Sequence, residues 1–68
     1  MITEIGITAG DIWHYLEKHG SADLNQLLRS ISGPKDLILM SLGWLAREGH
    51  ITLGDAASNF TARLNSNS

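Results

Sequence analysis

Residues 23–49, DLNQLLRSISGPKDLILMSLGWLAREG, carry the local signals of two consecutive helices. Asp23 and Gln26 form a capping box, in which each side chain can bond the backbone amide of the other residue. Apolar residues then recur at helical spacing as far as Ile31. These features predict a short helix that begins just after Asp23.

A tight turn separates this short helix from a longer one. Residues 32–34, Ser-Gly-Pro, end the first helix, and proline is tolerated in the first turn of the next. The longer helix is predicted from about Pro34 to Glu48, and it closes at Gly49. Two helices joined by a short glycine-containing turn predict a helix-turn-helix unit.

Upstream of this unit, the sequence predicts a short strand and a further helix. Residues 2–7 are rich in β-branched side chains, which favour a strand. Thr8 is followed three residues later by Asp11, and this pair indicates a helix start at Thr8. The helix is predicted to end at Gly20, because glycine suits the left-handed position after a helix. Its apolar stripe consists of Ile12, Trp13 and Leu16.

Downstream of Gly49, the apolar residues alternate instead of following a helical period. Ile51 and Leu53 flank Thr52, and residues 54–59 are turn formers. The second alternating run consists of Phe60, Ala62 and Leu64. Two such runs separated by a turn predict a β-hairpin. Trp13 and Phe60 are predicted to lie in the core.

The order of these elements predicts a winged helix-turn-helix domain, an α+β fold. It would have three helices and a small antiparallel β-sheet with a wing hairpin. The domain is expected to cover residues 1–64, and the polar residues 65–68 are expected to form a disordered tail.

The composition of the 68-residue chain excludes several function classes. The net charge of −2 argues against a highly basic nucleic-acid binder of the histone type. The absence of cysteine excludes disulfide scaffolds, cysteine-based zinc fingers and cysteine nucleophiles. A chain of this length is marginally stable by core packing alone, so a homodimer is a reasonable expectation.

No targeting segment, membrane span or catalytic motif stands out. The longest uninterrupted apolar run, residues 37–40, is too short to cross a bilayer, so we expect a cytoplasmic protein without a membrane partner. His14 and His19 project about 140° apart on a helix and cannot chelate one metal. Neither a nucleophile elbow nor a phosphate-binding loop is present, so we expect no enzyme, no metal and no cofactor.

The longer helix carries two apolar stripes on a helical wheel. The core stripe consists of Ile38, Leu42 and Leu45. The second stripe consists of Leu37, Met40 and Trp44. Either the N-terminal strand or the first helix covers this second stripe and completes a small core, or the stripe stays exposed. An exposed stripe would form a symmetric dimer or partner interface, because Trp and Met are favoured at interface centres. A small-molecule pocket beside it is a third alternative.

The same helix has a poor surface for reading DNA. In winged-helix DNA binders this helix enters the major groove, where base edges call for Arg, Lys, Asn or Gln. Here the sector opposite the core holds Asp36, Gly43 and Arg47. If the protein binds double-stranded DNA, the expected contacts are Arg29, Lys35, Arg47 and Arg63. A homodimer would double these four charges.

Two segments resemble a known family. Residues 42–51, LGWLAREGHI, resemble the end of the third helix in a family of small stand-alone winged-helix proteins of bacteria and archaea, whose function is unknown. Ile5-Gly6, Thr8-Ala9-Gly10 and Ile12-Trp13 resemble the opening of that family. The resemblance covers about Ile5 to Ile51. It implies the winged-helix fold and no particular activity.

Two function classes follow from the sequence. By analogy with the fold, the first is a non-catalytic DNA-binding module for transcription regulation, with weak or non-classical binding. The alternative is a protein-interaction or dimerisation module that has kept the winged-helix fold without binding DNA.

Overall fold

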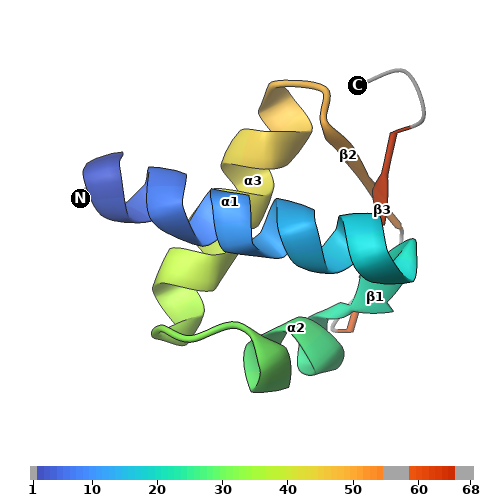
Figure 1. Ribbon diagram of the computed structural model, residues 1–68, viewed down its shortest axis with the longest axis horizontal. Helices are drawn as coiled ribbons and strands as arrows, with labels where there is room; N and C mark the ends of the chain where they lie inside the picture. Colours follow the sequence, from blue (N-terminus) through green and yellow to red (C-terminus); the bar gives the residue numbers. More distant parts are fainter. Residues whose placement is uncertain (1, 55–58, 66–68) are drawn as a thin grey trace.

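The computed structural model describes residues 2–54 and 59–65 of the chain. Its elements follow the order α1 (Ile2–His19), β1 (Ser21–Asp23), α2 (Leu24–Ser30), α3 (Lys35–Arg47), β2 (Ile51–Leu53) and β3 (Thr61–Leu64). Figure 1 shows α1 crossing α3, with the sheet beside the C-terminal end of α1. The predicted α+β fold, with a helix-turn-helix unit followed by a wing hairpin, is confirmed.

The first helix is longer than predicted. It begins at Ile2, so the predicted strand over residues 2–7 and the predicted helix start at Thr8 are wrong. Thr8 and Ala9 are instead buried inside the helix, on the side that packs against α3. Intrinsic preferences of β-branched residues are weak, and burial of one helix face against a neighbouring helix outweighs them.

The residues after α1 form a strand that was not predicted. Gly20 ends the helix with a φ of 86°, as expected for a left-handed residue after a helix. The sheet has the order β1-β3-β2, with both pairs antiparallel. Ala62 of β3 lies opposite Ala22 on one side and opposite Leu53 on the other. A three-residue strand is too short for a readable alternation, so only its pairing with β3 reveals β1.

The predicted capping box at the start of α2 is confirmed. The Asp23 side chain accepts a hydrogen bond from the Gln26 amide at 2.8 Å, and the Gln26 side chain accepts one from the Asp23 amide at 2.9 Å. The amide of Asn25 donates to the Asn59 side chain at 2.8 Å, which connects α2 to the segment before β3. The capping box and this bond together hold the N-terminus of α2 beside the sheet.

One apolar core joins the helices and the sheet. Ile38, Leu42 and Leu45 are buried, which confirms the predicted core stripe of α3. Phe60 is half-buried and packs against the core. Trp13 was also predicted to be a core residue, but it is only half-buried and lines a surface groove instead. The other buried apolar residues are Ala9, Ile12, Leu16, Ala22, Leu24, Leu27, Ile31, Ile51 and Ala62.

Asn65 extends the ordered structure beyond β3. It was assigned to the tail, yet its side-chain amide donates to the Gly49 carbonyl at 2.8 Å and its backbone amide donates to the His50 carbonyl at 2.9 Å. The Thr52 hydroxyl also bonds the Asn65 side chain. The remaining tail residues 66–68, and residues 55–58 of the predicted turn, lie outside the described residues.

Candidate interaction surface on α1 and α3

The second apolar stripe of α3 lies largely at the surface. Leu37 is half-buried, whereas Met40 and Trp44 are 41% and 46% exposed. Ser41, between them in sequence, is fully buried, and its hydroxyl donates to the Leu37 carbonyl at 2.7 Å. Helix α1 therefore packs over the Ser41 side of α3 and leaves Met40 and Trp44 accessible.

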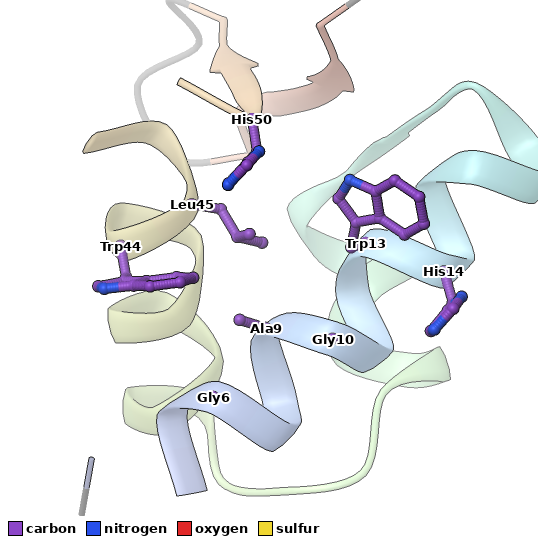
Figure 2. Close-up of a pocket in the computed structure, with 8 residues that line it drawn as sticks. All are labelled: Gly6, Ala9, Gly10, Trp13, His14, Trp44, Leu45 and His50. Carbon is purple, nitrogen blue, oxygen red and sulfur yellow. The ribbon is translucent and has the colours of Figure 1, made fainter. Parts of the chain in front are cut away.

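A groove of about 250 Å³ runs between α1 and α3 beside Trp44. In Figure 2, Trp44 and Trp13 stand on opposite sides of this groove, and Ala9 and Leu45 lie between them. His50, at the start of the wing, closes one end. The full lining consists of Gly6, Ala9, Gly10, Trp13, His14, Trp44, Leu45 and His50. The walls are thus mainly aromatic and the floor is apolar.

Gly6 and Gly10 add no side chains to the α1 side of the groove. A Cβ atom added at Gly6 or at Gly10 would meet nothing within 4 Å. Contacts within the chain therefore do not require glycine at either position. Glycine inside a helix is less favourable than alanine by about 0.5–1 kcal/mol. At both positions, the backbone of α1 itself lines the groove that lies between the two tryptophans.

The two indoles each contact an imidazole. The Trp44 and His50 rings lie 6.5 Å apart, and the Trp13 and His14 rings lie 5.4 Å apart in an edge-to-face arrangement. Ring pairs at these separations are mildly attractive. The contacts favour particular orientations of the indoles at the groove.

The four predicted DNA contacts lie on different elements. Arg29 is on α2, Lys35 and Arg47 are at the two ends of α3, and Arg63 is on β3. All four are exposed, and none forms an ion pair with the carboxylates of residues 2–54 and 59–65. Arg63 lines a second cavity, on the outer face of the sheet, whose other lining residues are uncharged. Arg63 therefore lies apart from the cations of α3.

His14 and His50 line the groove, whereas His19 is not among its lining residues. His14 lies 3.8 Å from the Glu17 carboxylate, and the His19 ring lies 4.2 Å from the Tyr15 ring. Within residues 2–54 and 59–65, no three His, Asp or Glu side chains form a group that could hold a metal ion. In the same residues, no helix is long and apolar enough to cross a membrane.

Several groove residues were missed in the sequence. Gly10 and Trp13 already lie on one side of the predicted helix, but Gly6 joins them only because the helix extends back to Ile2. The incorrect strand over residues 2–7 concealed that pattern. A helical reading of the whole N-terminal segment would have placed the two glycines beside the tryptophan.

The fold and its connections define the class of protein. A helix, a strand, two helices joined by a tight turn and a hairpin that completes the β1-β3-β2 sheet make a winged helix-turn-helix domain, which is typically a regulatory fold. The chain belongs to the winged helix-turn-helix family DUF2582, which it matches over residues 1–64. The predicted family resemblance is confirmed.

A relative of this chain comes from an archaeon. The chain is 38% identical over 50 residues to the uncharacterized protein MJ1608 of Methanocaldococcus jannaschii, and the match covers 71% of each protein. No solved structure matches the chain. The comparisons establish the family and the fold.

Proposed function

We propose that this protein is a non-catalytic interaction module that works as a homodimer, with Leu37, Met40 and Trp44 at the centre of the interface. The observation that carries this proposal is the exposure of Met40 and Trp44 on α3. A DNA-reading helix presents cations and amides at such positions. Here the helix presents a thioether and an indole, which are enriched at protein interfaces. We propose that this module acts in the cytoplasm, as expected from the sequence.

The small size of the chain supports the same proposal. A 68-residue domain buries only about 60% of the surface that its unfolded chain exposes, so additional apolar burial contributes substantially to its stability. A symmetric dimer would cover the Trp44 and Met40 side chains of both copies at once. Because of the two-fold symmetry, each apolar contact forms twice in the dimer and contributes twice to its stability.

The dimer proposal predicts that Trp44→Ala weakens self-association by about 30-fold or more, because a central interface tryptophan typically contributes about 2 kcal/mol. Sedimentation or light scattering over a micromolar dilution series measures the dissociation constant. Leu39→Ala is the matched control, because Leu39 is 36% exposed on the same helix but projects about 140° away from Trp44. A wild-type protein that stays monomeric throughout the series would overturn the proposal.

A second candidate function is weak binding of double-stranded DNA in transcription regulation. The observation that favours it is the exposure of Arg29, Lys35, Arg47 and Arg63 without ion pairs in the described part of the chain. Four cations in each protomer give a homodimer eight, which is within the range of about 6–10 phosphate contacts of duplex-binding proteins. The charges on α3 nevertheless balance, since Asp36 and Glu48 offset Lys35 and Arg47.

For DNA binding, fluorescence anisotropy with a labelled duplex at about 50 and 200 mM salt gives the decisive result. We expect weak binding with a steep salt dependence, and Arg47→Ala should lower the slope of log affinity against log salt by about one. Lys18→Ala is the control, because Lys18 is exposed on α1 instead of on the helix-turn-helix unit. The absence of binding at the lower salt concentration would reject this function.

A further inference from the structure

The groove between Trp13 and Trp44 has the shape and chemistry to receive a tryptophan from a second copy of the chain. Resting on the proposed homodimer, we infer that the two copies interlock. The Trp44 side chain of each copy enters the groove of the other, over Gly6 and Gly10 and against Trp13. The inserted side chain, Trp44, and the groove that receives it lie on the same face of one chain. An isologous two-fold interface requires this arrangement.

The size of the groove favours a side chain as its occupant. Its volume of about 250 Å³ lies below the roughly 300–1,000 Å³ of typical small-molecule sites. The groove is flanked by indoles and floored by Ala9 and Leu45, so it suits one flat aromatic ring. A second indole between Trp13 and Trp44 would form ring contacts of the kind that aromatic pairs favour. The two Trp44 side chains would then meet near the two-fold axis.

The glycines of α1 supply an independent argument. Gly6 and Gly10 are helical positions where alanine would fit and would favour the helix more strongly. Among the residues that the structure describes, no atom lies within 4 Å of a Cβ added at either position. A ring that approaches from a second copy uses that space, because only a bare backbone lets it reach the floor of the groove.

A stable dimer needs only a modest share of the surface of this protein. A standard interface buries about 800 Å² per partner, which is about a fifth of the 4390 Å² that this protein exposes. The face that α1 and α3 share contains both the groove and the exposed Met40 and Trp44.

The charges on the two helices favour α1 against α3 over α1 against α1, because α1 is acidic and the charges of α3, with Glu48 at its C-terminal end, sum to zero. The exposed charges of α1 sum to −2, from Glu4, Asp11, Glu17 and Lys18. Arg47 lies one turn beyond Trp44 on α3, and it has no ion-pair partner among the described carboxylates. When Trp44 docks over the glycines, it brings Arg47 toward the acidic helix of the other copy. This pairing also avoids the like-charge repulsion that α1 against α1 would create.

Filling the groove tests the interlocking directly. Gly10→Leu should raise the dimer dissociation constant by about 30-fold or more, since the leucine occupies the space that the incoming Trp44 needs. Gly43→Leu is the matched control. Gly43 is likewise a helical glycine with nothing within 4 Å of an added Cβ, but it is exposed, whereas Gly10 is half-buried, and it lies outside the groove lining. Both variants should keep the wild-type circular dichroism spectrum, and Gly10→Leu should melt below wild type only at concentrations where wild type is dimeric.

Mixing two defective variants supplies the second measurement. Gly10→Leu keeps its Trp44 side chain, and Trp44→Ala keeps the Gly6, Gly10 and Trp13 side of its groove, although it loses the wall that Trp44 forms. An equimolar mixture should therefore form a heterodimer tighter than either homodimer by about 10-fold or more. If wild type dimerises but Gly10→Leu dimerises equally well, or the mixture shows no gain, the interlocking is wrong while the proposed homodimer stands. If wild type is monomeric, both proposals fail together.

Discussion

Replacing Leu42 by alanine is expected to lower the free energy of unfolding by about 2–5 kcal/mol. Leu42 is 1% exposed and lies on the core stripe of α3. The substitution removes apolar contacts and leaves a cavity that the surrounding helices fill only partly. Because native domains are stable by only about 5–15 kcal/mol, and small ones lie at the low end, this loss should leave a large unfolded fraction.

Urea unfolding followed by circular dichroism, with all variants at one protein concentration, measures this loss. The concentration must be held constant because dimerisation adds to the apparent stability. Leu39→Ala is the control, since the same atoms are removed from a side chain that is 36% exposed; its cost should stay below about 1 kcal/mol. Equal losses in the two variants would contradict the packing of α3 described above.

Alanine at Gly33 and alanine at Gly43 are expected to change stability in opposite directions. Gly33 lies in the turn before α3 with a φ of 129°, a backbone conformation that side-chain-bearing residues rarely adopt. Alanine there should cost about 1–3 kcal/mol. Gly43 lies within α3, and alanine there should stabilise the protein by about 0.4–1 kcal/mol, because a Cβ meets open space and the helix gains propensity.

Thermal unfolding of the two variants gives the comparison. For a domain of this size, about 1 kcal/mol corresponds to a change of about 4–8 °C in Tm. The Gly33→Ala variant should therefore melt clearly below wild type and the Gly43→Ala variant slightly above it. A Gly33→Ala protein as stable as wild type would show that the turn relaxes to a negative φ without cost.

The helix-turn-helix unit and the wing could be predicted because their signals are local. The capping box of Asp23 and Gln26 forms within a single turn, and the structure contains both of its hydrogen bonds. The alternation around Thr52 needs only the neighbouring residues to be recognised. The start of α1 and the strand β1 could not be predicted in the same way. Both depend on partners far along the chain: α3 for the first and β3 for the second.

The candidate surface was predictable in part. Helical spacing alone places Leu37, Met40 and Trp44 on one side of α3, and it separates them from the core stripe. The exposure of Met40 and Trp44 was left open, because it depends on how far α1 extends over α3. The groove beside them was missed, since Gly6 belongs to the part of α1 that was predicted as a strand and Gly10 to the predicted start of the helix.

The amino-acid sequence was sufficient to determine the family, the order of the helices and the two stripes of α3, because each depends on residues within a few turns of one another. Only the tertiary structure decided which stripe is covered. The path of α1 buries Ser41 and leaves Trp44 at the surface, one helical turn away. That difference arises from how two helices cross, and the crossing is set by packing over the whole interface between them instead of by any single local pattern.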